Sequence, residues 1–401
     1  MTDAERSEWR ERARRLGSMV CVATADWDAP LWTNKQHLMS RLAQEMPVLY
    51  VNSLGLREPR PTRADARRVL ARLRALRHGG QVVTRAGRNE DGPTIVAPSV
   101  IPFHRFALVR AVNRRLLSRS LRAHIKRLPR PITLWTYNPA VVDELDLADF
   151  DRVVYHAVDD YATTPGIPAR AVRGLEERLV QKAERVFATS PALADRFAAL
   201  APGRTVLLPN VADADHFGTA RLPGPVPEDL LAIPSPRVVY TGALSDHKVD
   251  WGLVEEVARR LPSYHFVLIG PLGEEQAATG HSSAGELNNV HILGARPYAV
   301  LPNYLRGAYA AIIPYRVSEH TDSVFPMKVW EYLAAGVPVI STPLAAVIAL
   351  NPPVAVAGSA ENFVQALTDV DRSEAAASQR QVAASSNTWD RNLAQMLREL
   401  S

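Results

Sequence analysis

The chain has 401 residues, 47% of them hydrophobic, and this length predicts two domains of ordinary size rather than one. Its single cysteine, Cys21, excludes an internal disulfide. The longest apolar stretch, 329–357, contains a glutamate and several prolines and is therefore not expected to cross a membrane. The charged N-terminal sequence does not resemble a signal peptide, so we expect a soluble, cytoplasmic protein.

Positive charge is concentrated in the first third of the chain, although the net charge is only +5. Residues 1–130 carry 26 Lys and Arg against 11 Asp and Glu, and the remainder carries 21 against 31. This asymmetry indicates an acidic partner, such as a phosphate-bearing acceptor or an anionic membrane. Nucleic acid is the weakest candidate, because the basic stretches lack interleaved aromatic residues. Arginine outnumbers lysine 42 to 5, which makes the position of each lysine informative.

Short β-branched runs alternate with helical patterns through the first half of the chain. Thr33 or Asn34 can cap a helix that carries Leu38, Leu42 and Met46 on one face. Short apolar strands that are each followed by a helix indicate a parallel sheet covered on both faces. The strands expected here are 19–24, 47–52, 94–97, 132–136, 152–158, 185–188 and 205–208.

The same alternation restarts after the proline-rich stretch 219–236, which predicts a linker. The sequence therefore predicts an α/β protein with two doubly wound, Rossmann-like domains, 1–218 and 237–384, and a C-terminal helix at about 385–401 that packs back on the first domain. The strands expected in the second domain are 237–241, 265–269, 290–293, 310–313, 337–341 and 354–357.

The most informative segment runs from Ser323 to Thr342. Pro326 suits the first turn of a helix and Gly336 its end, and a buried strand follows. The free N–H groups and the dipole at such a helix start favour an anion such as a diphosphate. Glu331, within this helix, is placed to accept hydrogen bonds from a ribose diol.

This segment resembles the retaining glycosyltransferases of glycosyltransferase family 4, which have the GT-B fold of two Rossmann-like domains facing across a cleft. The subgroup with a Pro-x-Lys-x-x-Glu-Tyr-Leu-Ala motif is the most similar. The family has two glutamates separated by seven residues. The second corresponds to Glu331 and holds the nucleotide ribose, whereas the first is replaced by Ser323, which leaves the donor sugar open.

Two further loops carry the resemblance. The loop from Gly242 to Lys248 is similar to the family's Gly-Arg-Leu-x-x-x-Lys loop, whose lysine binds the donor diphosphate. Ala243 stands in place of the arginine, so Lys328 or Arg316 is expected to supply the second cation. The stretch 294–298 resembles the loop that contacts the nucleobase, near Arg296.

The resemblance implies transfer of a sugar from a UDP- or GDP-sugar with retention of configuration, without metal or another cofactor. The implied acceptor is a glycan, a lipid-linked intermediate or a small metabolite, in cell-surface glycan or specialised-metabolite biosynthesis. The expected donor-binding residues are Glu331, Lys328, Ser323, Val324, Phe325, Pro326, Gly242, Arg296 and Arg316. The expected catalytic residues are Lys248, Asp159 and Asp160, and the expected acceptor-binding residues are Trp32, Asn34 and His156.

Other interpretations remain open at this point. Asp159 and Asp160 are equally consistent with capping a helix or turn. The basic stretches 67–77 and 105–128 fit ordinary cationic surface helices somewhat better than docking on anionic lipid. A nucleotide-sugar 2-epimerase of the same fold and a catalytically silent membrane-surface scaffold are the alternative functions.

Overall fold

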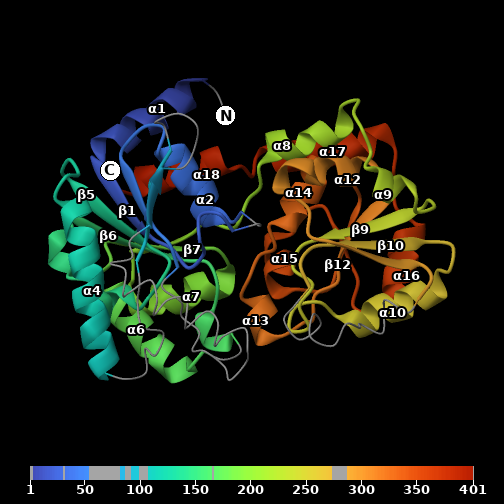
Figure 1. Cartoon of the computed structure of the whole chain (residues 1–401). Helices are drawn as coiled ribbons and strands as arrows, with labels where there is room; N and C mark the ends of the chain where they lie inside the picture. Colours follow the sequence, from blue (N-terminus) through green and yellow to red (C-terminus); the bar gives the residue numbers. More distant parts are fainter. Residues whose placement is uncertain are drawn as a thin grey trace. The chain divides into compact units, whose positions relative to one another are not determined.

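The computed structural model describes residues 3–29, 32–53, 82–85, 92–98, 107–164, 167–272 and 287–400. The chain divides into two compact units, Met1–Pro209 with Leu393–Ser401, and Asn210–Asn392. Each unit is a β-sheet with helices on both faces (Figure 1). No helix in the described ranges is long and apolar enough to cross a membrane.

The first unit contains an eight-stranded sheet in the order β3-β4-β2-β1-β5-β6-β7-β8. All neighbours are parallel except β3 and β4, which pair antiparallel at the edge. The residues of β1 are all buried, as expected for a central strand covered on both faces. The strands are β1 (Ser18–Val22), β2 (Val48–Val51), β3 (Val82–Arg85), β4 (Thr94–Ala97), β5 (Ile132–Thr136), β6 (Arg152–Ala157), β7 (Arg185–Ala188) and β8 (Thr205–Leu207).

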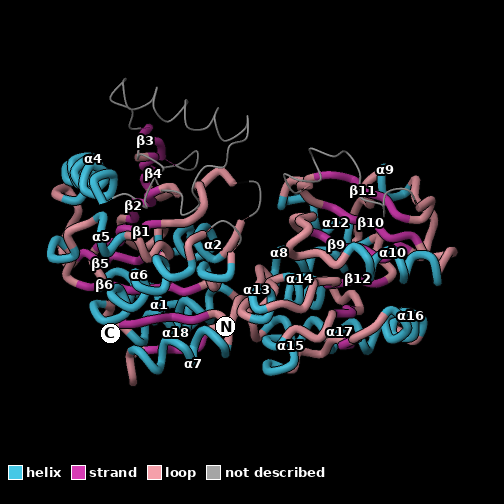
Figure 2. Tube along the Cα trace, turned by 90° about the horizontal axis from the view of Figure 1, so that it is seen from below, coloured by secondary structure: helices cyan, strands magenta, loops and turns pink. Residues whose placement is uncertain are grey.

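Helices cover both faces of this sheet. Leu117 and Leu121 of α4 and Leu179 of α6 join the strands in one hydrophobic core. Figure 2 shows α4 at the outer edge of the unit beside α5, against which it packs. The helices are α1 (Asp3–Arg15), α2 (Asn34–Leu42), α4 (Ala107–Ile125), α5 (Val141–Glu144), α6 (Ala169–Lys182), α7 (Pro191–Leu200) and the last residues of α18 (Trp389–Glu399), with 3-10 turns η1 (Leu147–Asp149) and η2 (Tyr161–Thr163).

The second unit contains a six-stranded, all-parallel sheet in the order β11-β10-β9-β12-β13-β14. The first strand of this unit, β9, lies in the middle, and the strand order reverses between β9 and β12. Such a reversal leaves a crevice at the carboxyl ends of the two strands, where open α/β sheets bind ligands. The strands are β9 (Arg237–Thr241), β10 (His265–Ile269), β11 (Val290–Gly294), β12 (Ala310–Ile313), β13 (Val339–Ser341) and β14 (Ala355–Val356).

The helices of the second unit surround a single large core. They are α8 (Ala214–Gly218), α9 (Glu228–Leu231), α10 (Trp251–Arg260), α12 (Leu301–Arg306), α13 (Glu319–Asp322), α14 (Lys328–Ala334), α15 (Ala345–Leu350), α16 (Ala360–Thr368) and α17 (Glu374–Ser385), with 3-10 turns η3 (Thr219–Arg221) and η5 (Tyr298–Val300).

The structure differs from the sequence-based organisation at three places. The first unit ends at Pro209 rather than 218, because α8 packs against α14 and α17. Residues 219–236, predicted as a linker, pack on the second unit: Leu230 is fully buried, and the Arg306 guanidinium donates hydrogen bonds to three backbone carbonyls of 219–225. Strand β3 was not predicted.

The helix at the centre of the family resemblance, α14, starts two residues later than expected. Its first residue is Lys328, so Pro326 lies just before the helix and its carbonyl accepts from the N–H of Val329 (3.2 Å). Gly336 ends the helix as predicted, in a left-handed conformation with φ +72°. The N–H groups of Gly336 and Val337 then satisfy the carbonyls of Leu333 and Tyr332, at 2.9 and 3.1 Å.

Replacing Gly336 by alanine is expected to lower the free energy of unfolding by about 1–2 kcal/mol, because a Cβ atom disfavours this conformation. The Cβ would also lie 2.8 Å from Cδ of Arg221. Gly252→Ala is the control, because this exposed glycine lies within α10 and alanine there is expected to stabilise by up to about 1 kcal/mol. Denaturant titration of both variants measures the difference; equal effects would contradict the proposed role of the glycine.

Candidate functional site

Two lysines and two tyrosines gather at the carboxyl ends of β9 and β12, where the strand order reverses. Tyr240 lies in β9, Tyr315 follows β12, and α14 contributes Lys328. Lys248 comes from the loop after β9, which joins the end of β12 through an antiparallel bridge between Val249 and Tyr315. The topology therefore brings together side chains that are up to 88 positions apart in the sequence.

Lys328 occupies space that is open only because residue 242 is a glycine. Gly242 directly follows β9 with φ +147°, and a Cβ atom there would lie 2.2 Å from Cε and 2.7 Å from Nζ of Lys328. Gly270, after β10, is equally restricted, since its Cβ would lie 1.8 Å from the carbonyl oxygen of Gly242. The two glycines therefore let the ends of β9 and β10 and the side chain of Lys328 pack together, where no further side chain would fit.

The aromatic rings hold the two ammonium groups. Nζ of Lys328 lies 5.9 Å from the centre of the Tyr240 ring, and Nζ of Lys248 lies 5.8 Å from that of Tyr315. The two rings meet edge to face at 6.2 Å. Since each cation is within cation–π distance of a ring, the tyrosines can keep the like-charged lysines in place before a ligand arrives.

The loop that carries Lys248 is fixed by its backbone. The N–H of Lys248 donates to the carbonyl of Ser245 (2.9 Å), and the Lys248 carbonyl accepts from the N–H of Arg316 (2.8 Å). The side chain of Arg316 donates to the carbonyl of Val249 (3.3 Å), and the residue is otherwise exposed. The predicted cation Arg316 thus lies beside the lysine pair, although its guanidinium also ties the loop.

Charge coupling within the cluster favours binding of an anion. Burial alone would lower the pKa of Lys328, but the nearby Tyr315 and Glu331 raise it overall, so the ammonium is charged at neutral pH. Burial likewise opposes ionisation of Tyr315, yet the charges of Lys328 and Lys248 bring the pKa of this phenol below its usual value. The lowered pKa of Tyr315 reflects the positive potential of the two lysines, whereas the raised pKa of Lys328 reflects the acidic groups beside it.

Glu331 lies one turn after Lys328 in α14 and is only 7% exposed. Burial raises the pKa of its carboxyl, and the charge of Lys328 opposes that rise. Within the described ranges no hydrogen bond is made by its carboxylate oxygens. A nearly buried carboxylate without a hydrogen-bond donor retains full capacity to accept from a ligand hydroxyl.

The other predicted donor-binding residues fall into two groups. The segment before α14 is buried: Phe325 is fully buried beside Trp330, and its carbonyl accepts from Nδ2 of Asn210 (2.9 Å). Ser323 donates to the carbonyl of His320 (2.7 Å). Val324 and Pro326 are also buried, so any ligand contact by this segment would come from its backbone.

Arg296 lies apart from the lysine cluster, after β11. Its guanidinium binds Asp229 (2.7 Å) and the hydroxyl of Tyr304 (2.8 Å), and its pKa is raised mainly by the hydrogen bond to Asp229. This side chain links α9 to α12, so a contact between a nucleobase and the loop near Arg296 would involve the backbone.

In the first unit, the strand order reverses between β1 and β5, and the predicted acceptor residues surround that point. His156 is 1% exposed, between the rings of Tyr137 (4.9 Å) and Trp135 (5.8 Å), and neither of its ring nitrogens has a partner in the described structure. Asn34, in the first turn of α2, is also buried. Trp32 contacts the ring of Trp27 at 5.5 Å.

The buried lysine Lys35 was missed by the sequence analysis. It lies in the first turn of α2, 5% exposed, with Nζ 5.1 Å from the centre of the Tyr137 ring. Its charge and the burial of His156 together lower the pKa of the imidazole from 6.5 to about 3, burial being the larger cause. Two features of the sequence could have identified Lys35 as a candidate: it is one of only five lysines, and it directly follows the predicted helix cap.

The two predicted catalytic aspartates have different environments. Asp160 is 6% exposed, accepts from Arg173 (2.8 Å) and caps η2 through the N–H of Ala162 (3.2 Å). Asp159 is partly exposed, and no hydrogen bond is found for its side chain in the described ranges. The capping interpretation therefore describes Asp160, whereas Asp159 is the aspartate with a carboxylate available to a ligand.

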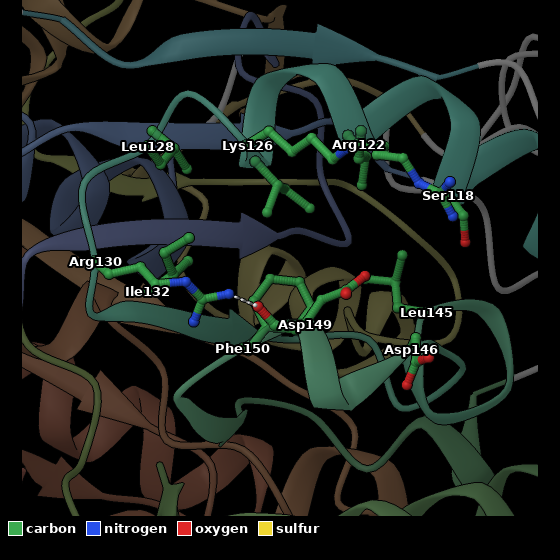
Figure 3. Close-up of a pocket in the computed structure, with 12 residues that line it drawn as sticks. Ser118, Arg122, Lys126, Leu128, Arg130, Ile132, Leu145, Asp146, Asp149 and Phe150 are labelled. Atoms are coloured by element: carbon green, nitrogen blue, oxygen red, sulfur yellow. Dashed lines mark hydrogen bonds between the residues drawn. The ribbon is translucent and has the colours of Figure 1, made fainter.

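A separate hollow of about 490 Å³ lies at the opposite edge of the first sheet (Figure 3). Arg122 and Lys126 line one side, Asp146 and Asp149 the other, and Arg130 pairs with the carboxylate of Asp151 (2.7 Å). Because this hollow is at the amino ends of β5 and β6, it is distinct from the edge where α/β sheets bind their substrates.

Comparison with known proteins supports the assignment of the enzyme class. Residues 235–371, which carry the lysine cluster, match the family model of the glycosyl transferases group 1. The putative teichuronic acid biosynthesis glycosyltransferase TuaH of Bacillus subtilis is 25% identical over 234 residues. That alignment spans 55% of this chain and 57% of TuaH, so the chain matches little more than half of this relative's length.

Two solved structures share the fold. HepE from Anabaena, in complex with UDP-glucose, is 15% identical with a TM-score of 0.65, over 96% of this chain and 98% of HepE. A trehalose-6-phosphate protein from E. coli bound with UDP-2-fluoro glucose is 12% identical with a TM-score of 0.67, over 96% of this chain and 98% of its own. The likeness confirms the predicted GT-B class of two Rossmann-like units. The matching family model and the curated relative are both described as glycosyltransferases.

Burial of neutral His156 makes a contribution to stability that is lost on acidification, and comparison with His156→Asn isolates this contribution from that of other buried groups such as Glu176, whose raised pKa acts in the opposite direction. The unfolded chain takes up a proton on this histidine below pH 6.5, whereas the folded chain does not until about pH 3, so folding is disfavoured increasingly as pH falls through this window. Between pH 7 and 5 the expected loss is about 2 kcal/mol. Urea titration at both pH values should show this loss reduced in His156→Asn; an unchanged difference would contradict it.

Proposed function

We propose that this protein is a glycosyltransferase that moves a sugar from a nucleotide diphosphate donor to an acceptor, with retention of anomeric configuration and without a metal ion. UDP is the preferred nucleotide in this proposal, because HepE and the E. coli trehalose-6-phosphate protein are found with UDP-linked sugars. GDP is the alternative nucleotide.

The observation that carries the proposal is the lysine pair at the reversal point of the second sheet. Cleavage of the bond between the anomeric carbon and the diphosphate leaves negative charge on the leaving group. Lys248 and Lys328, preoriented on Tyr315 and Tyr240, supply two positive charges there without rearrangement. Fixed ammonium groups can do the work that a divalent cation does in other transferases, which is the basis for expecting metal independence.

Glu331 is the proposed ribose ligand. Its nearly buried carboxylate, one helical turn from Lys328, can accept from both hydroxyls of a ribose whose diphosphate reaches the lysines. Asp159 is the proposed contact to the sugar or acceptor. Asp160 supports the neighbouring turn through its ion pair with Arg173.

The acceptor class is the least constrained part of the proposal. The name of TuaH favours cell-surface glycan biosynthesis, with a glycan or lipid-linked acceptor, over a small metabolite. Incubation of a UDP-sugar without acceptor tests the 2-epimerase alternative: an epimerase converts the donor to its epimer, whereas the transferase leaves it intact apart from slow hydrolysis.

Calorimetric titration with UDP in the presence of EDTA tests the donor site. Lys248→Met and Lys328→Met should each weaken UDP binding about tenfold or more and leave uridine binding unchanged, because the lost charge faces the diphosphate. Glu331→Gln should weaken binding of UDP but not of 2′,3′-dideoxy-UDP. The control Lys182→Met, at an exposed lysine of α6, should bind like the wild type.

Metal-independent binding that is insensitive to all three site variants would contradict the site assignment. UDP binding that appears only when Mg²⁺ is added would contradict metal independence while leaving the nucleotide assignment intact.

Gly242→Ala tests whether the glycine acts through Lys328. Its Cβ overlaps the end of the lysine side chain and must displace it. We expect UDP affinity to fall about as far as in Lys328→Met. In the double variant the affinity should fall no further than in Lys328→Met alone, because the two substitutions remove the same interaction. Additive losses would contradict this coupling and point to a separate role for the glycine backbone.

A further inference from the structure

Helix α4 of the first unit has a face that the proposed reaction does not use. One side of the helix is fully buried, and it carries Asn113, Leu117 and Leu121 at every fourth position. The opposite ridge follows the spacing i, i+4, i+7, i+11 and i+14, which keeps residues on one side of an α-helix. We call this ridge the α4 outer face; it consists of Leu108, Val112, Arg115, Arg119 and Arg122.

The first two turns of this face expose apolar side chains. Leu108 is 78% exposed, more than any other large apolar side chain found exposed in the described ranges, and Val112 is 36% exposed. They lie one turn apart on the same ridge. A single exposed leucine needs no explanation, but two aligned on the outermost line of a helix form a small apolar tip.

The rest of the face is cationic, although Arg122 also lines the hollow bordered by Asp146 and Asp149. Helix α4 contains five arginines and no acidic residue. Arg115, Arg119 and Arg122 are exposed, and none of the three forms an ion pair with another described residue. Lys126 and Arg127 extend the positive charge beyond the helix end. The face therefore combines an apolar tip with a row of guanidinium groups, a combination that ordinary solvation of a surface helix does not require.

We propose that the α4 outer face docks the protein on an anionic membrane surface. The arginines would pair with lipid phosphates, to which a guanidinium presents parallel N–H donors, while Leu108 and Val112 enter the boundary between headgroups and acyl chains. A nucleic acid offers phosphates to the arginines but no apolar layer to Leu108 and Val112. A membrane offers both, so it matches the apolar tip as well as the cationic part of the face. This surface belongs to the first unit alone, and the proposal is independent of the proposed donor site.

Cosedimentation of the full chain with vesicles tests the proposal. The wild type should bind vesicles that contain phosphatidylglycerol and should not bind pure phosphatidylcholine. The triple variant Arg115→Gln, Arg119→Gln and Arg122→Gln should bind at least about tenfold more weakly. The matched control, Arg10→Gln, Arg12→Gln and Arg15→Gln in α1, removes the same charge from arginines that pair with glutamates and should stay within about twofold of the wild type.

The apolar tip separates a membrane from other polyanions. Leu108→Ser should weaken vesicle binding about threefold or more and leave binding of a DNA oligonucleotide unchanged. Circular dichroism and thermal unfolding of each variant check that the chain is folded. The proposal fails if the two triple variants bind equally, since net charge alone then explains binding. It also fails if Leu108→Ser has no effect on vesicles, since the face is then a general polyanion site.

Discussion

Lys328 lies against the backbone of Gly242 because neither that residue nor Gly270 has a side chain to occupy the space. The contact joins the start of α14 to the end of β9, and the same helix brings Glu331 to the crevice one turn later. Tyr332, the next residue in the helix, is also held in place, because its hydroxyl accepts a hydrogen bond from the N–H of Thr241 (2.8 Å). The position of α14 relative to the sheet is thus fixed on both sides of the proposed site.

The tyrosines solve an electrostatic problem that this arrangement creates. Two ammonium groups near one crevice repel each other, and burial adds a desolvation cost. The rings of Tyr240 and Tyr315 offer their faces to the cations, and Glu331 adds an opposite charge nearby. The cluster is therefore charged and ordered before any ligand binds, which is the condition under which fixed charges stabilise a leaving group most effectively.

Much of this architecture was predictable from the sequence, because buried parallel strands are continuous apolar runs. The expected strands match those of both sheets, except that β3, an antiparallel edge strand without a following helix, was missed. The linker prediction for 219–236 relied on prolines, whereas Leu230 and the carbonyls bound by Arg306 attach this segment to the second unit. Local composition carries little information about such long-range contacts.

The site residues were predictable only where a motif or a rare residue marked them. Gly242, Lys248, Lys328 and Glu331 follow from the family resemblance, whereas the tyrosines were missed, although Tyr315 stands directly after a predicted strand and its proline. The burial of His156 and the ion pair of Asp160 depend on side chains from other strands and helices. The basic stretch 105–128 became interpretable when its buried ridge was known, while 67–77 lies outside the described residues.

The compact fit of Lys328 also limits which cationic side chain this position can hold. Throughout most of this chain a positive charge is supplied by arginine, whereas position 328 carries one of five lysines. A guanidinium is planar and broader than an ammonium, and the space above Gly242 is bounded by the Tyr240 ring. An arginine at position 328 would therefore meet the backbone of Gly242 and the Tyr240 ring, so the shape of the lysine side chain matters here as much as its charge.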